Sequence, residues 1–416
     1  MKKASFVIIV ILLLLLCSCG SNKTEISNLK ISSKNSSVST SDNNSNGLPT
    51  VFEINKGRQI KINNISFLVG LNNNSIIYEN KINDTGNTAD EIYYSLNVNS
   101  IKTIQIGRDN NYNASSGDYI IMKSDYLFYT PYIMEKNTPA YSMLLEFSLT
   151  GGKQKTIKRE SIYPPLQFYS RLNDSEFIIY GPNLVQGAQS SYDYYIRKYN
   201  VDTNNMQQIV SSNYNGDTGN GKAFITLCCK DNKIYVYTFK TVNKTNMYSI
   251  EVYDDSGKLL KILPIPLLEE ELQVSVKNVT EDAVAHMNVY DDYFVFKTLN
   301  SRYLIYKYNN GVLDLINTNN QFDGDNLIKN IGDTFDANNF IYFLNRETNE
   351  LNLFDTNTGK IITLKVNLDK QYKYLNDCVV DGSGNIVVQL SNIIDVQNAI
   401  YKYYYIKSND IIKTIS

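Results

Sequence analysis

One short motif recurs seven times along the chain, an Asn- or Asp-rich turn followed by a strand of apolar and aromatic residues. The segments "NNNSIIYEN", "KDNKIYVYT" and "ANNFIYFLN" are three examples. Self-similarity at a spacing of 46 to 59 residues indicates a repeat architecture in which each repeat is one supersecondary unit. The strand centres are Tyr78, Tyr129, Tyr180, Tyr237, Phe296, Phe343 and Gln389.

Each recurring strand is followed by two more strands joined by a tight turn, as in "YSIEVYDDSGKLLKIL" and "RYLIYKYNNGVLDLI". Asp-Ser-Gly and Asn-Asn-Gly supply residues that tolerate the positive φ of tight hairpins. A further strand precedes the turn, as in "AFITLCCKDN". The pattern therefore predicts seven units of four short antiparallel strands, rich in Tyr, Ile and Val, and no helical segment of note.

Four-stranded units repeated in this way resemble the blades of a β-propeller over roughly residues 64–416. The resemblance implies an all-β fold of seven four-stranded antiparallel blades, with six or eight blades as alternatives. It does not extend to the Trp-Asp ending of WD40 repeats, because the chain has no Trp. We expect the propeller domain to span residues 49–416, and residues 51–62 to supply an extra strand that latches the ring to its last blade.

The long connecting segments of the predicted propeller share one face. In propellers, the loop between the second and third strands and the connection between blades lie on the same side, and here "GPNLVQGAQSSYD" and "SNYNGDTGNGK" belong to this long-loop face. Binding residues occur disproportionately on loops held by a rigid scaffold, so we expect a ligand there. Tyrosine offers flat contact area with one polar tip, and the expected ligand-binding residues are Tyr112, Tyr132, Tyr192 and Tyr214. The alternative is that these loops are neutral insertions.

The N-terminus has the three parts of an export signal. Lys2 and Lys3 precede an unbroken run of eleven apolar residues, which is too short to cross about 30 Å of hydrocarbon and suits a signal-peptide core. The following Leu16-Cys17-Ser18-Cys19 resembles the lipobox of bacterial lipoproteins. The resemblance implies that residues 1–18 are removed and that Cys19 receives the lipid. An ordinary secretory signal is the alternative.

Residues 19–48 continue from this cysteine as a Ser- and Asn-rich tract with few large apolar residues. Such a tract cannot bury enough surface to offset its ordering entropy, so it is expected to be a flexible tether. The expected location is the extracytoplasmic face of the cell membrane, with membrane lipid as a partner through Cys19.

Composition argues against several classes of function. A net charge of −2 without a basic field does not favour nucleic-acid binding. The lone His286 gives no catalytic set, so no catalytic residue is assigned. No metal or cofactor is expected, although Asp323 and Asp325 resemble part of a calcium loop and leave that ion open. The adjacent Cys228 and Cys229 should point to opposite faces of one strand, which is poor geometry for joint ligation.

These observations favour a binding or scaffolding module that uses the long-loop face to engage a protein, a peptide or an envelope glycan. The alternative is an extracytoplasmic carbohydrate-active enzyme, because glycosidases need only two carboxyl groups about 5–10 Å apart. The candidate carboxylates near that face are Asp90, Glu91, Asp193, Asp217 and Asp282.

Overall fold

The structure is a computed structural model. It describes residues 50–53, 57–62, 66–82, 89–112, 115–122, 125–133, 141–160, 167–184, 191–215, 218, 220–242, 245–265, 284–298, 303–316, 325–327, 339–368, 370–393 and 399–415. The predicted signal peptide, Cys19 and the whole of the predicted tether lie outside these residues, as do Asp217, Asp282 and Asp323.

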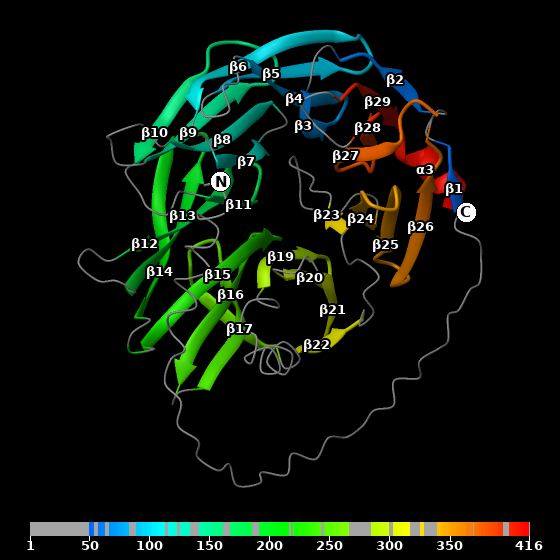
Figure 1. Ribbon diagram of the computed structural model, residues 1–416. Helices are drawn as coiled ribbons and strands as arrows, with labels where there is room; N and C mark the ends of the chain where they lie inside the picture. The colour runs from blue at the N-terminus through cyan, green and yellow to red at the C-terminus, as the bar shows by residue number, and fades with distance from the viewer. Residues whose placement is uncertain are drawn as a thin grey trace, which may run out of the picture.

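The described strands form six sheets arranged as a ring around a central axis (Figure 1). The first sheet contains β3 (Ser66–Asn72), β4 (Ser75–Ile82), β5 (Ala89–Asn97) and β6 (Lys102–Tyr112). The second contains β7 (Ser115–Met122), β8 (Tyr126–Ile133), β9 (Tyr141–Ser148) and β10 (Lys155–Glu160). The third has eight strands, namely β11 (Gln167–Arg171), β12 (Glu176–Leu184), β13 (Ser191–Asn200), β14 (Asn205–Asn215), β15 (Asn220–Lys230), β16 (Lys233–Val242), β17 (Thr245–Asp254) and β18 (Leu259–Pro264).

The other three sheets complete the ring. The fourth contains β19 (Val284–Tyr290), β20 (Tyr293–Thr298), β21 (Tyr303–Asn309) and β22 (Val312–Leu315). The fifth contains β23 (Asp325–Leu327), β24 (Phe340–Asn345), β25 (Glu350–Asp355) and β26 (Lys360–Val366), with β1 (Thr50–Phe52) added beyond β26. The sixth contains β27 (Tyr374–Val380), β28 (Ile386–Ser391), β29 (Tyr401–Ile406) and β2 (Arg58–Ile60).

This strand order is that of an all-β propeller, as predicted. The seven recurring segments all form strands, which are β4, β8, β12, β16, β20, β24 and β28. The tight turns have the expected backbone, because Asp231 and Asn232 both have positive φ before β16. The turn before β22 has the same character, with φ of +49° at Asn310 and +93° at Gly311.

The prediction of seven separate four-stranded sheets is wrong, because the described strands form six sheets. The outer strand β14 pairs at its end with the inner strand β15, which joins two four-stranded meanders into one sheet of eight strands. Among the described residues, the junction consists of two residue pairs, Tyr214 with Gly221 and Asn215 with Asn220.

The N-terminal segment closes the ring, as predicted for residues 51–62. Strand β2 is the outer strand of the last sheet, where Arg58 pairs with Tyr405 and Ile60 with Tyr403. Ile60 is buried in the apolar cluster between the last sheet and the first. Strand β1 pairs in parallel with β26 of the preceding sheet, so the segment holds two neighbouring sheets.

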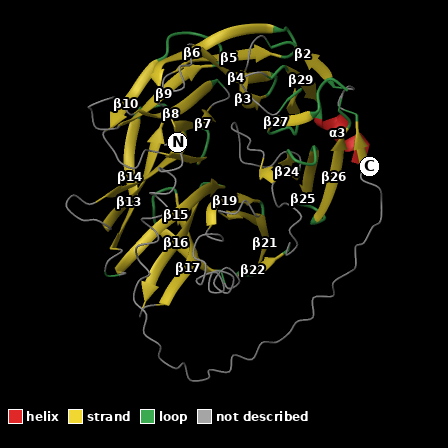
Figure 2. Cartoon of the chain, in the orientation of Figure 1, coloured by secondary structure: helices red, strands yellow, loops and turns green. Residues whose placement is uncertain are grey.

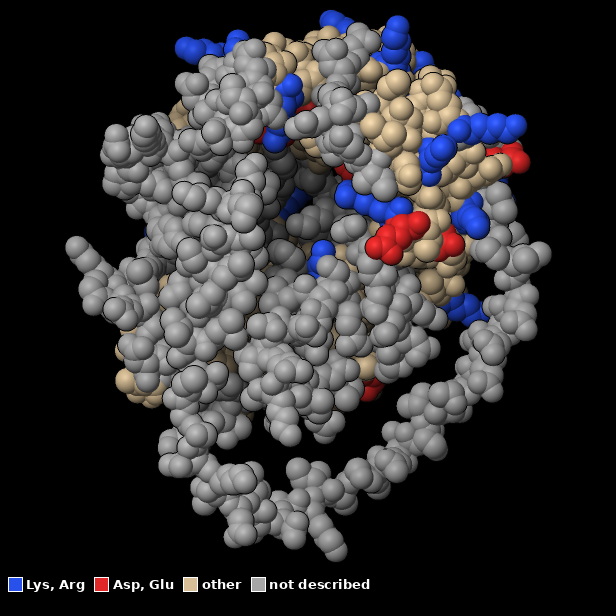
Figure 3. Space-filling view, in the orientation of Figure 1, with Lys and Arg blue, Asp and Glu red and all other residues tan. Residues whose placement is uncertain are grey.

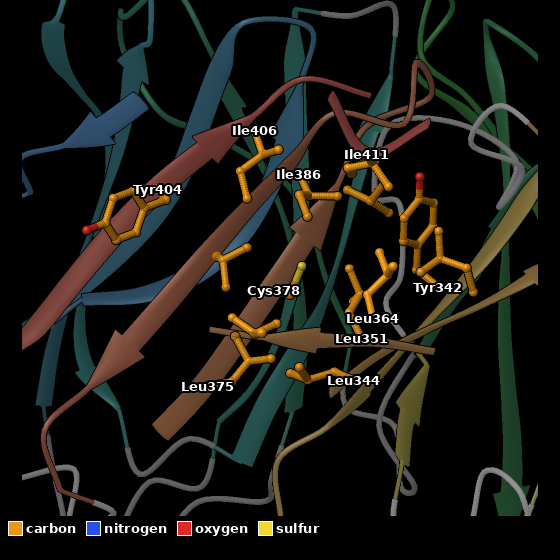
Figure 4. Packing of buried hydrophobic residues seen from close by; sticks show 14 of the residues in the cluster. Tyr342, Leu344, Leu351, Leu364, Leu375, Cys378, Ile386, Tyr404, Ile406 and Ile411 are labelled. Carbon is orange, nitrogen blue, oxygen red and sulfur yellow. The ribbon is translucent and has the colours of Figure 1, made fainter. Parts of the chain in front are cut away.

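A C-terminal helix, α3 (Ser408–Ile415), departs from the prediction of no helix of note (Figure 2). Asp410 in its first turn and Lys413 in its last suit the helix dipole. The buried Ile411 packs into a cluster formed by the fifth and sixth sheets, together with Leu364, Ile386 and Ile406 (Figure 4). Among the described residues, no helix is long and apolar enough to cross a membrane.

The two adjacent cysteines behave as strand alternation predicts. Cys228 packs in the cluster shared with the following sheet, whereas Cys229 packs in the cluster between the two halves of the eight-stranded sheet. Both are buried free thiols, as is Cys378. Burial raises the pKa of Cys228 and of Cys229, so both remain protonated.

Candidate ligand-binding site

The four predicted ligand-binding tyrosines lie at the long-loop ends of strands. Tyr192 is on β13 and Tyr214 on β14, where the two residues are direct cross-strand partners. Both side chains are half-buried rather than exposed on loops. The backbone places Tyr112 at the end of β6 and Tyr132 near the end of β8, and their side chains lie outside the described part.

Tyr192 and Tyr214 belong to a group of aromatic side chains at the joined sheet. The ring centroids of Tyr192 and Tyr194 are 6.3 Å apart, and those of Tyr214 and Phe239 are 5.4 Å apart. Phe239 in turn lies 5.3 Å from Tyr248 on β17. Burial, with Tyr192 and Tyr214 nearby, raises the pKa of Tyr194, so its hydroxyl stays protonated. These contacts reinforce the junction of β14 and β15 with aromatic packing.

The junction depends on one glycine. Gly221 has φ of +96°, a conformation that other L-residues rarely adopt. A Cβ atom at this position would lie 2.1 Å from the carbonyl oxygen of Asn213, so only glycine permits this approach of the two strands. Next to it, the Ser212 hydroxyl donates a hydrogen bond of 2.7 Å to the carbonyl oxygen of Lys222.

A surface cavity of about 400 Å³ adjoins this junction. Strands β13 and β14 supply two facing pairs of its lining residues, Asp193 opposite Asn213 and Tyr195 opposite Ser211. Side chains alternate along a strand, so Tyr192 and Tyr214 project from the other side of these strands and are not among the lining residues. The described lining residues are Asp193, Tyr195, Ser211, Ser212, Asn213, Gly221 and Lys222.

The acidic side of the cavity is formed by Asp193. The Tyr195 hydroxyl donates a hydrogen bond of 3.3 Å to the Asp193 carboxylate. Desolvation, and then the neighbouring Asp193, raises the pKa of Tyr195, which therefore remains a neutral donor. The Arg197 guanidinium carbon lies 5.8 Å from the centroid of the Tyr195 ring.

The basic residue of the cavity, Lys222, forms an ion pair with a buried acid. Lys222 Nζ is 2.6 Å from a carboxylate oxygen of Glu251, which is 6% exposed. The Tyr253 hydroxyl donates a hydrogen bond to the same carboxylate, and Lys222 donates to the Tyr253 hydroxyl at 3.3 Å. Lys222 thus has a fixed position with its charge neutralised.

The carboxylates considered for catalysis are dispersed. Asp193 lies on β13 and lines the cavity, whereas Glu91 lies on β5 of the first sheet and is 5% exposed. Glu91 accepts hydrogen bonds from the hydroxyls of Tyr93 at 2.8 Å and Tyr129 at 3.4 Å, and is 3.3 Å from Lys81 Nζ. For Asp90 the structure describes only the backbone, which lies on β5. Asp193 and Glu91 are the two candidates whose side chains the structure describes, and they lie in different sheets.

The face of the ring seen in Figure 3 is hollowed near its centre, and Lys and Arg side chains of described residues lie around the hollow.

Asp377, on the inner strand β27, is an acidic residue that was not among the candidates predicted from the sequence. Burial raises the pKa of Asp377 to about 6, opposed by Arg346, whose guanidinium is 3.9 Å away. Among the described residues, no cluster of three or more His, Cys, Asp or Glu could hold a metal ion.

A second Asp-rich turn, "DGSGN" at residues 381–385, uses its acid within the turn itself, whereas Asp323 of the calcium-like loop lies outside the described residues. The buried Asp381 of "DGSGN" accepts hydrogen bonds from the backbone amides of Ser383 and Asn385 and from the Asn385 side chain. Its carboxylate therefore stabilises its own turn. Asp325 is placed by its backbone on β23.

Among the described lining residues, the sequence singled out Asp193 alone, as a candidate carboxylate. The segment "SNYNGDTGNGK" of the predicted long-loop face contains Ser212, Asn213, Gly221 and Lys222, but no motif within it distinguished them. A glycine within a strand pattern often marks close approach of another backbone, and Gly221 was therefore the available signal.

No known protein family and no curated protein matches this chain. Similar solved structures include the β-propeller domain of the Trilobed protease from Pyrococcus furiosus, at 12% identity, with 82% of this chain and 94% of that chain covered and a TM-score of 0.49. Sqt1 from Saccharomyces cerevisiae is 10% identical, with 85% of each chain covered and a TM-score of 0.44. A putative 6-phosphogluconolactonase from Bacteroides fragilis is 11% identical, with 81% and 95% covered and a TM-score of 0.43. The strand order of the described sheets identifies the chain as a β-propeller.

Proposed function

We propose that this protein is a binding module, held at the extracytoplasmic face of a membrane by a lipid on Cys19, that takes its ligand at the long-loop end of the eight-stranded sheet. The observation that carries the proposal is the cavity between β13, β14 and β15, with its fixed Lys222 and its acidic Asp193. A concave site with a few placed polar groups is the usual form of a small-molecule site.

The arrangement of the eight-stranded sheet belongs to the same proposal. This sheet consists of two meanders, β11 to β14 and β15 to β18, that share two residue pairs among the described residues. We infer that each meander acts as one blade. The junction between these two blades then forms the wall of the binding site.

Binding accounts for the described residues better than catalysis does. An enzyme of the glycosidase type needs two carboxyl groups at a short, defined separation. Asp193 and Glu91 lie in different sheets, and Glu91 is committed to Lys81 and two tyrosine hydroxyls.

A blocking substitution tests the binding site. We expect Ser211→Trp, at an exposed position of the cavity wall, to abolish retention of the ligand from bacterial envelope extract. The control is Ser256→Trp, at the exposed turn between β17 and β18, which should retain the ligand as the unsubstituted protein does. Immobilised protein and mass spectrometry of the bound material provide the measurement. Equal retention by both variants would contradict the proposal.

The anchor has its own test. We expect Cys19→Ala to move the protein from the membrane fraction to the soluble fraction of an expressing bacterium, because the residue that would carry the acyl chains is gone. Cell fractionation with immunoblotting measures this, and Cys17→Ala serves as the control that should stay membrane-bound. An ordinary secretory signal would instead give the same distribution for all three proteins.

A further inference from the structure

The charge of the cavity restricts its ligand. Among the described lining residues, Lys222 is the single cation, and its ammonium is neutralised by Glu251 at 2.6 Å. Asp193 contributes a carboxylate that accepts a hydrogen bond from the Tyr195 hydroxyl. An anionic ligand would therefore meet a negative charge without an uncommitted cation on the lining. The site fits an uncharged ligand better than a phosphate or a carboxylate.

The polar groups of the cavity suit a ligand with many hydroxyls. Ser211 and Asn213 are exposed on the wall and provide a hydroxyl and an amide, each able both to donate and to accept. Asp193 faces Asn213 across the strand pair, and the Cβ atoms of such partners are about 5 Å apart. A carboxylate acceptor therefore lies beside an amide that both donates and accepts. Neighbouring hydroxyls of a sugar ring require such closely spaced donors and acceptors.

Tyr195 adds the apolar part of the site. It is the one aromatic residue among the described lining residues, and it stands next to Asp193 and opposite Ser211. An aromatic ring beside hydrogen-bonding groups matches a pyranose, which has an apolar C–H face and a polar edge. Arg197 and the Asp193 hydrogen bond keep the Tyr195 ring in place.

The size of the cavity separates a small ligand from a protein partner. A volume of about 400 Å³ falls in the ordinary range of small-molecule sites, about 300–1,000 Å³. A stable protein interface needs about 800 Å² on each partner. The cavity by itself therefore fits one or a few sugar units rather than a folded protein.

We propose that the cavity binds the end of an uncharged carbohydrate chain, with Asp193, Ser211 and Asn213 on its hydroxyls and Tyr195 against its ring face. This inference rests on the proposed function, in which the same cavity is the binding site.

The test uses the full-length lipidated protein in detergent, screened against arrayed neutral oligosaccharides, sialylated oligosaccharides and polyol-phosphate polymers. We expect binding to neutral saccharides alone. In calorimetric titration with the bound saccharide, Asp193→Asn and Tyr195→Ala should each weaken binding at least tenfold. Asp255→Asn, on the exposed turn between β17 and β18, is the control and should bind as the unsubstituted protein does.

The outcomes separate this inference from the proposed function. Binding of anionic polymers alone, or of no saccharide, overturns the carbohydrate assignment. If Ser211→Trp still abolishes ligand retention from envelope extract, the proposed binding site stands without it. If a neutral saccharide binds equally well to Ser211→Trp and Asp193→Asn, the cavity is not the site, and both proposals fail. Circular dichroism of each variant excludes loss through unfolding.

Discussion

Removal of strand β2 is expected to destabilise the propeller more than any single substitution. A chain of residues 63–416 lacks the outer strand of the last sheet and leaves the edge of β29 unpaired. It also loses Ile60, which is 2% exposed between the first and last sheets. Truncating one buried Ile to Ala costs about 2–5 kcal/mol, and loss of the whole strand should exceed that. Since domains are stable by only about 5–15 kcal/mol, we expect marginal folding and aggregation through the open edge.

Nested truncation provides the control for this prediction. A chain of residues 57–416 loses β1 and its parallel pairing with β26 but keeps β2. It should remain folded, with a modestly lower Tm. Within the full chain, Ile60→Ala should lower the free energy of unfolding and the exposed Gln59→Ala should not. Thermal and denaturant unfolding measure both pairs, and equal stability of the two truncated chains would show that β2 does not close the ring.

Gly221→Ala should break the junction between β14 and β15. The substitution places a Cβ atom 2.1 Å from the Asn213 carbonyl oxygen and requires positive φ from a residue that resists it. Backbone strain of this kind costs about 1–3 kcal/mol, and the clash must also displace a strand. We expect a lower free energy of unfolding together with loss of ligand binding, since Asn213 and Lys222 both line the cavity.

Gly311→Ala separates the clash from the backbone strain. Gly311 has a similar φ of +93°, but a Cβ atom there has no heavy atom within 4 Å. This variant should lose about 1–2 kcal/mol from the left-handed backbone alone and keep full ligand binding. Denaturant unfolding and ligand retention, measured on both variants, decide the matter. If Gly221→Ala matches Gly311→Ala in both measurements, close strand approach is not what shapes the site.

Local turn chemistry explains why the strands could be predicted. A two-residue hairpin needs positive φ, and Asn310-Gly311 supplies residues that adopt it at little cost. The same rule locates Asp231-Asn232 before β16. These signals depend only on neighbouring residues, so the sequence alone is enough to find them. The burial of Cys228 and Cys229 in two different clusters likewise follows from strand alternation.

The joining of two meanders could not be predicted in the same way. Pairing of Tyr214 with Gly221 depends on how two strands approach after the chain has turned between them. In the sequence, Gly221 is the one signal of this pairing. The orientation of the tyrosines has a similar limit, because the blades of a propeller are covered on both faces. Strand alternation places the side chains of Tyr192 and Asp193 on opposite faces of β13, but it does not show which face borders a cavity.

The C-terminal helix was not predicted because it is short. Eight residues contain too few turns for a helical period to stand out from a β-rich sequence. Ser408 and Asp410 before the apolar Ile411 were the available signals of a helix start. The burial of Ile411 against the fifth and sixth sheets, which stabilises so short a helix, is a tertiary effect.

The central claim is that the ligand binds at the long-loop end of the joined sheet. Its most direct test is in-cell photocrosslinking of the full chain with a photoreactive residue in place of Asn213, at the cavity, or of Asp255, at the opposite turn. The account predicts a discrete crosslinked product at position 213 and none at position 255. A product at 255 and none at 213 would contradict it.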